Sequence, residues 1–380
     1  MRGLHYRDKQ SGAWILTTGL IFMLGIQLNT VRAAVTTAAN PPASPEYQDL
    51  KLSGQWFLGY QNGWNAGKHY RLFLVKRGSI AVLKQFGERI SGRITYDITV
   101  DRDGDGEGDI EMRLKHCFLK AGARQLAFFN QPALEFGLVH RPWLSFEEHI
   151  NRYRAEGEMF LERSGIVNSA DFGITFSALL GEPITAASRR GAITGYPGKW
   201  GSLAVGLYNG GGYHALEKNR NKTVEGRLTL RPMPSTLAGF QSSLHGAYGK
   251  GNTPAAPKWW LRSLCLTFQN QRLVGQAMVV DGCGNYKGNL VDTNGVSLLF
   301  QSYSLFTEVR FPKINSSLFA RWDMLRFADQ DSYPRQIWQI AGVAYHFAEK
   351  CKLIIDYDRE WASGQGGVDR KYELVVEVGY

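Results

Sequence analysis

The chain has 380 residues, a length that allows one large barrel or two ordinary domains. Its 44 Lys and Arg residues outnumber its 34 Asp and Glu residues, which gives a formal net charge of +10. Only one long apolar run occurs, near the N-terminus, and this excludes a protein built from several membrane-spanning helices.

The N-terminal segment has the layout of a secretory signal peptide. Three basic residues lie within the first nine positions, residues 13–28 are apolar, and small residues precede a cleavage site after Ala33. An N-terminal membrane anchor is the alternative, but the run is shorter than the about 20 residues that a spanning helix needs. We therefore expect residues 1–33 to be a cleaved signal peptide and residues 34–49 to be a flexible periplasmic segment.

From Leu50 onward, apolar and polar residues alternate in segments separated by Gly, Asn, Asp and Pro. In residues 223–231, for example, Val224, Leu228 and Leu230 share one face of an expected strand, and the charged residues share the other. Sixteen strands are expected, at 50–61, 70–84, 89–101, 109–120, 134–143, 171–181, 200–209, 223–233, 237–249, 259–268, 272–281, 295–311, 314–327, 335–347, 351–361 and 371–380.

An even strand number places both ends of the chain on the same side of a closed barrel, and short and long connections should then alternate. Mostly they do, although residues 182–199 are long where a short turn is expected. The sequence therefore predicts an all-β fold, an antiparallel transmembrane β-barrel of about sixteen strands over residues 50–380.

The last strand, residues 371–380, ends with an aromatic residue, Tyr380, on its apolar face. This resembles the terminal strand of outer-membrane barrels, which the barrel-assembly machinery recognises. A strand of a soluble β-sandwich is the alternative.

One long connection, residues 144–170, carries Arg152, Arg154 and Arg163. The sequence from Ser145 to Glu148 fits a capping box and predicts a short helix. A sixteen-stranded barrel is wide enough to leave an aqueous channel, and an inward loop would narrow it. The alternative is a surface helix whose charges form local Glu–Arg pairs.

Four short motifs resemble the phosphate- and polyphosphate-selective porin family, the porin O and P family. They are the sequences at 73–78 (FLVKRG), 160–164 (FLERS), 171–173 (DFG) and 206–210 (GLYNG). The resemblance covers roughly residues 50–380 and implies a sixteen-stranded, usually trimeric, anion-preferring porin of the Gram-negative outer membrane. The full arginine and lysine ladder of that family is not present.

Candidate anion-binding residues follow from the polar faces of the strands and from the long connection. If the apolar faces point outward, the basic side chains of the opposite faces point into the lumen, where they could bind anions. Carboxylates share these faces, so the alternative is that the basic and acidic side chains pair with each other in rows. The candidates are Arg93, Arg113, Lys115, Arg141, Arg227, Arg231 and Arg321, with Arg152, Arg154 and Arg163 in the connection.

An acidic, Gly-rich segment has the spacing of the first ligands of a calcium loop, at Asp101, Asp103, Asp105 and Asp109. Position 12 is Met112, where such a loop has a bidentate glutamate. A hairpin loop of turn residues is the alternative. A structural Ca²⁺ is thus the one metal that the sequence suggests, and no cofactor is expected.

No catalytic motif, nucleic-acid-binding pattern or zinc-ligand spacing occurs, and the four cysteines could be free or paired. We therefore expect a porin, not an enzyme, that passes small hydrophilic or anionic solutes. Outer-membrane lipid and lipopolysaccharide should surround it, and it could form a homotrimer. A closed structural or adhesive barrel is the alternative, and a barrel enzyme is a third possibility.

Overall fold

The computed structural model describes residues 49–100, 108–184, 195–328, 333–363 and 367–380. The expected signal peptide and all but the last residue of the expected N-terminal segment lie outside these ranges. Asp49–Tyr380 forms one compact unit. No helix among the described residues is long and apolar enough to cross a membrane.

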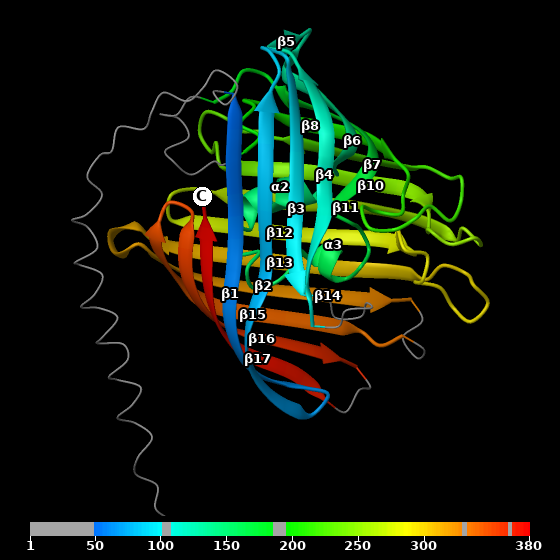
Figure 1. The fold of residues 1–380 in the computed structure, drawn as a ribbon, viewed down its shortest axis with the longest axis vertical. Coiled ribbons are helices and arrows are strands. Elements are labelled where there is room, and N and C mark those ends of the chain that lie inside the picture. The colour runs from blue at the N-terminus through cyan, green and yellow to red at the C-terminus, as the bar shows by residue number, and fades with distance from the viewer. Residues whose placement is uncertain (1–48, 101–107, 185–194, 329–332, 364–366) are drawn as a thin grey trace, which may run out of the picture. The chain divides into compact units, whose positions relative to one another are not determined.

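Sixteen antiparallel strands form one sheet that closes into a barrel, because each pairs with the next along the chain and the last pairs with the first. Figure 1 shows β17, in red, beside β1, in blue. The short strand β5 (Gln125–Leu126) belongs to the connection between β4 and β6. The sixteen are β1 (Leu50–Asn65), β2 (Lys68–Gln85), β3 (Ile90–Val100), β4 (Ile110–Gly122), β6 (Phe129–His140), β7 (Ala170–Leu180), β8 (Gly201–Tyr208), β9 (Thr223–Leu230), β10 (Phe240–Lys250), β11 (Lys258–Gln269), β12 (Leu273–Cys283), β13 (Leu299–Phe311), β14 (Ser316–Phe327), β15 (Gln336–Ala348), β16 (Cys351–Ala362) and β17 (Val368–Gly379).

The predicted fold class is confirmed, and every predicted strand overlaps an observed one. On β14 the alternation is regular: Leu318 and Trp322 point outward, and Asp323 points inward and is fully buried. A period of two residues places successive side chains on opposite faces of a strand. The outside of the barrel is consequently apolar over most of its strands.

The inner wall does not follow the expected polar pattern everywhere. Several strands from β10 to β17 also carry buried apolar side chains on their inward face, such as Trp259, Met278, Phe306 and Trp338. These side chains form one cluster with apolar residues of the connection between β6 and β7. The inward apolar face is therefore a packing surface for a segment inside the barrel.

That segment contains two short helices, α2 (Leu144–Ile150) and α3 (Phe160–Arg163). Figure 1 shows both between β1–β4 and β11–β14. We call residues 141–169 the inner loop. The loop packs mainly on the half of the wall formed by β10 to β17, and a cavity remains between it and β1 to β4.

The connections at the end where β17 finishes are mostly short, such as those at 270–272 and 349–350. At the other end, β1 and β2 are joined by only two residues, Ala66 and Gly67. A 3-10 turn, η2 (Pro312–Ile314), joins β13 to β14. Residues 181–200 remain the long exception that the sequence indicates.

Candidate functional site

The inner loop is fixed to the wall where it leaves β6. The guanidinium Nε of Arg141 donates to Glu225 Oε2 at 2.6 Å, and both side chains are fully buried. The Arg141 guanidinium also lies 5.3 Å from the ring centroids of Tyr208 and Trp259. His245 Nε2 contacts the second oxygen of Glu225 at 3.1 Å. A buried charge pair with these partners holds the start of the loop in one place.

Helix α2 begins one residue before the predicted cap. The predicted short helix is therefore confirmed, but Ser145 lies within it and its hydroxyl donates to the backbone oxygen of Arg141 at 2.9 Å, so the predicted capping box is wrong. Trp143 Nε1 and Gln276 Nε2 donate to the two carboxyl oxygens of Glu147, at 2.8 and 2.7 Å. Burial nevertheless raises the pKa of Glu147 to about 7, since these neutral donors only partly replace water.

The apolar side of the inner loop packs against the wall. Phe146, Ile150, Phe160 and Leu161 are at most 1% exposed and belong to the apolar cluster. The Phe160 ring meets Trp338 of β15 edge to face at 6.2 Å. Burial of aromatic and aliphatic side chains contributes roughly 1.5–3 kcal/mol for each. The loop is thus a packed element of the barrel interior.

The polar side of the inner loop carries Arg154 between two carboxylates. Its Nη1 lies 2.9 Å from Glu148 and 2.6 Å from Glu162. Burial alone would raise the pKa of Glu162, but attraction to Arg154, and then to Lys115 and Arg77, lowers it to about 2. Basic side chains of the barrel wall therefore stabilise the ionised form of Glu162 on this side of the loop.

Two β-bulges place those wall cations. On β2, Arg77 and Val75 lie opposite successive residues of β1, so Lys76 is the extra residue of a bulge. On β4, His116 and Leu114 lie opposite successive residues of β3, so Lys115 is the extra residue of a bulge. A bulge lets two successive side chains point to the same face. Each bulge therefore sends two consecutive nitrogen-bearing side chains into the barrel.

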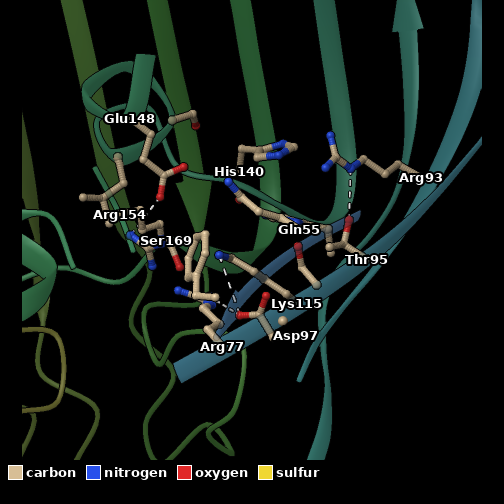
Figure 2. Close-up of a pocket in the computed structure, with 16 residues that line it drawn as sticks. Gln55, Arg77, Arg93, Thr95, Asp97, Lys115, His140, Glu148, Arg154 and Ser169 are labelled. Carbon is tan, nitrogen blue, oxygen red and sulfur yellow. Dashed lines mark hydrogen bonds and ion pairs between the residues drawn. The ribbon is translucent and has the colours of Figure 1, made fainter. Parts of the chain in front are cut away.

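A cavity of about 180 Å³ lies between this part of the wall and the inner loop. Figure 2 shows Arg154 and Glu148 on one side of it and Arg93 on the other, with Arg77, Lys115 and Asp97 between. We call it the lumenal cavity. It is lined by Gln55, Phe57, Arg77, Gly78, Ser79, Arg93, Thr95, Asp97, Lys115, His116, His140, Leu144, Ser145, Glu148, Arg154 and Ser169.

The charge of the lumenal cavity is positive. Four of its lining side chains are Lys or Arg, and two are carboxylates. Asp97 lies 3.7 Å from Lys115 and also pairs with Arg77. The Nε of Arg93 donates to Thr95 at 3.0 Å, and no described carboxylate forms an ion pair with this guanidinium.

Two histidines add hydrogen-bonding capacity at the edge of the lumenal cavity. The rings of His116 and His140 lie 4.0 Å apart, and His140 Nδ1 contacts Glu135 at 3.0 Å. Neither ring nitrogen of the buried His116 has a hydrogen-bond partner among the described residues. Such a side chain can accept a hydrogen bond from a solute in the cavity or donate one to it.

Of the predicted cations, Arg93, Lys115 and Arg154 meet at the lumenal cavity. Arg163 and Arg321 instead tie the inner loop to the wall. Arg163 contacts Asp358 at 3.1 Å, and Arg321 pairs with Asp323 and donates to the backbone oxygen of Glu158 at 2.7 Å.

The other predicted cations lie elsewhere. Arg113 pairs with Glu111 of its own strand. Arg152 lines a second cavity of about 440 Å³, together with Arg310 and Lys352, near the short connections. Arg231 is buried, and its Nε donates to the backbone oxygen of Gly198 at 3.2 Å.

Arg227 lies between helix α2 and the described end of the long 181–200 connection. Its guanidinium lies 4.4 Å from the ring centroid of Phe146 and 4.7 Å from that of Tyr196. Gly195 approaches α2 so closely that a Cβ would clash with the His149 ring, and its φ of +63° also favours glycine. The described end of this connection, at Gly195 and Tyr196, therefore packs against helix α2, an arrangement that the sequence does not reveal.

The described side chains include no group of three or more His, Cys, Asp or Glu that could hold a metal ion. Asp109 is described, but Asp101, Asp103 and Asp105 of the predicted calcium loop lie outside the described residues. All four cysteines are free.

No protein-family model and no curated protein sequence matches the chain. Its fold is similar to solved outer-membrane proteins. The outer-membrane channel DcaP of Acinetobacter baumannii is 13% identical with a TM-score of 0.57, over 87% of this chain and 97% of that one. An anion-selective porin from Comamonas acidovorans is 10% identical with a TM-score of 0.57, and the match covers 87% of this chain and 99% of that one. A loop L8 deletion mutant of OmpT, an outer-membrane protein of Vibrio cholerae, has the same identity, TM-score and coverage as the Comamonas porin.

Sequence reasoning missed Arg77, His116 and His140. Lys76 and Arg77 are consecutive charges in the middle of an alternating strand. That break in the alternation is the signal of a bulge. Lys115 and His116 break the alternation of β4 in the same way. His140 carries no comparable signal, because a scattered histidine has no characteristic spacing.

Proposed function

We propose that the chain is an outer-membrane porin, exported by its N-terminal signal, through which small hydrophilic solutes diffuse with a preference for anions. The observation that carries this proposal is the lumenal cavity, where Arg77, Arg93, Lys115 and Arg154 outnumber two carboxylates. Cations placed at the narrow part of a channel attract anions and repel cations.

Small oxyanions such as phosphate are the solute class that we favour. Guanidinium groups present paired donors that match the oxygens of such ions, and Arg93 forms no ion pair within the described chain. The resemblance to the phosphate- and polyphosphate-selective porin family favours the same class. A homotrimer fits as well, since a solved structure of similar fold, OmpT of Vibrio cholerae, is described as a trimer form.

Conductance across a planar bilayer under a salt gradient tests the proposal. We expect open channels and a reversal potential that indicates anion preference. The double variant Arg93→Gln with Lys115→Gln leaves equal numbers of cations and carboxylates at the cavity. Its ratio of anion to cation permeability should fall towards one.

Arg262→Gln is the matched control, because Arg262 is exposed on the outer face of β11 and faces Asp281. It should leave selectivity unchanged. Absence of channels in the wild-type protein would support a closed structural barrel, and cation preference would contradict the role of the lumenal cavity. Turnover of a lipid or ester substrate would support a barrel enzyme.

A further inference from the structure

The outer surface of β16 and β17 changes in character along the two strands. Taken in order from the end far from the C-terminus, four outward pairs lie directly opposite each other across the two strands. The pairs are Arg359 with Arg370, Tyr357 with Tyr372, Ile355 with Leu374, and Leu353 with Val376. The surface therefore passes from basic to aromatic to apolar within one ladder.

The arginine pair is unusual on energetic grounds. Like charges directly opposite each other on neighbouring strands destabilise a sheet. Both side chains are exposed, and no described carboxylate forms an ion pair with either. Two acids of these strands point inward and pair there, Asp358 with Arg163 and Glu373 with Lys371. The adjacent Glu360 and Asp369 lie opposite each other and form no ion pair with either arginine, and Asp369 accepts a hydrogen bond from the backbone N–H of Ala66. Both guanidinium groups therefore keep donors that an anion from outside the chain can use.

Aromatic rings surround the same place. The Arg370 guanidinium lies 4.7 Å from the ring centroid of Trp64 on β1, and Trp64 packs on His69 of β2. Below the arginines, the rings of Tyr357 and Tyr372 are 5.0 Å apart. Trp and Tyr are enriched where a membrane protein meets the headgroup region.

We infer that this surface binds the phosphorylated headgroup of a lipid in the outer leaflet, with its acyl chains along the apolar rows below. The inference rests on the proposed outer-membrane location, in which the arginine pair lies at the end away from the periplasm. Arg359 and Arg370 contact the phosphate oxygens, for which guanidinium geometry is suited. Tyr357 and Tyr372 lie at the interface, and Ile355 and Leu374 face the chains. We call this the lipid site.

The test titrates the purified full-length protein in detergent with lipid A, a glycolipid carrying two phosphates, and with its fully dephosphorylated form. Native mass spectrometry counts the bound lipid. We expect the double variant Arg359→Gln with Arg370→Gln to bind lipid A about tenfold more weakly, because two charge-assisted contacts are lost. Arg262→Gln, an exposed outward arginine that has its own acidic partner, should bind like the wild type.

Equal binding of lipid A to the wild type and the double variant would overturn the inference. Equal binding of the dephosphorylated lipid to the wild type would do so too, as would displacement of lipid A by excess inorganic phosphate, which would identify a site for the free ion. Because the arginine pair lies outside the barrel, the double variant should keep wild-type conductance and selectivity. If the protein forms channels but does not bind lipid A in this way, the lipid site is wrong and the proposed porin function stands.

Discussion

Lys76 and Arg77, like Lys115 and His116, break the strict alternation of their strands and point together into the barrel. A strand without a bulge would offer one of each pair to the lumen and the other to the outside, where an unpaired charge costs free energy. Single inserted residues thus concentrate charge on one side of the interior.

Glu147 provides a prediction at the scale of one residue. Its raised pKa, about 7, means that the folded protein holds the proton more tightly than the unfolded chain, where the carboxyl titrates near 4.3. The contribution of Glu147 to stability is therefore largest below about pH 4.3 and is lost as the pH rises through about 7. Each pKa unit corresponds to about 1.4 kcal/mol, so we expect the free energy of unfolding to fall by about 4 kcal/mol in all, with about 3 kcal/mol of the fall between pH 5 and pH 8.

The measurement is the free energy of unfolding at pH 5 and at pH 8 for the wild type and for Glu147→Gln. The amide cannot ionise, so the variant should lose most of this difference. The same pH dependence in both proteins would show that another group is responsible.

The inner loop is the element that determines how much of the barrel stays open. It is held by the Arg141–Glu225 pair at its start and by Phe160 and neighbouring apolar residues in the middle. Near its end, Asn285 donates to the backbone oxygen of Gly165 at 3.0 Å. These contacts come from three different connections or strands and keep the loop against one half of the wall.

Phe160→Ala tests whether packing holds that element. The side chain is fully buried, so truncation should cost about 3–5 kcal/mol through lost burial and a cavity. The barrel strands do not depend on it, and we expect the loop to loosen while the sheet persists. Limited proteolysis should cut the inner loop faster, and open-channel current noise should increase.

Phe172→Ala is the matched control, because Phe172 on β7 points outward and is 45% exposed. It should leave loop cleavage and current noise as in the wild type. If Phe160→Ala also leaves both unchanged, packing of α3 does not fix the loop.

Closure of the whole barrel depends on pairing between the ends of the chain. Ten residue pairs join β1 and β17, from Gln55 with Gly379 to Trp64 with Arg370. A closed sheet has no unpaired edge, which the interior of a bilayer requires because lipid cannot satisfy backbone hydrogen bonds. Large apolar side chains cover its outside, including Leu305 and Leu299.

Depth-dependent substitution tests the membrane-spanning arrangement. Leu305 lies in the middle of β13 and points outward, and Leu299 is the first residue of the same strand. We expect Leu305→Arg to lower the free energy of unfolding from a bilayer by about 2–4 kcal/mol, and Leu299→Arg by about 0–1 kcal/mol. Denaturant unfolding from lipid vesicles measures both. Equal costs would mean that the strand does not span the bilayer as proposed.

The sequence by itself determined the strands and their number, because side-chain alternation is local and repeats in every segment. It also located a connection that folds inward and three of the cations at the lumenal cavity, Arg93, Lys115 and Arg154. Only the tertiary structure decided which cations stay available to a solute. Arg141, Arg154, Arg163 and Arg321 have the same chemistry as Arg93 but are engaged by carboxylates from distant strands, from the inner loop or from their own strand. Charge pairing depends on register and on bulges, and each of these moves a side chain from one partner to another without changing the local pattern.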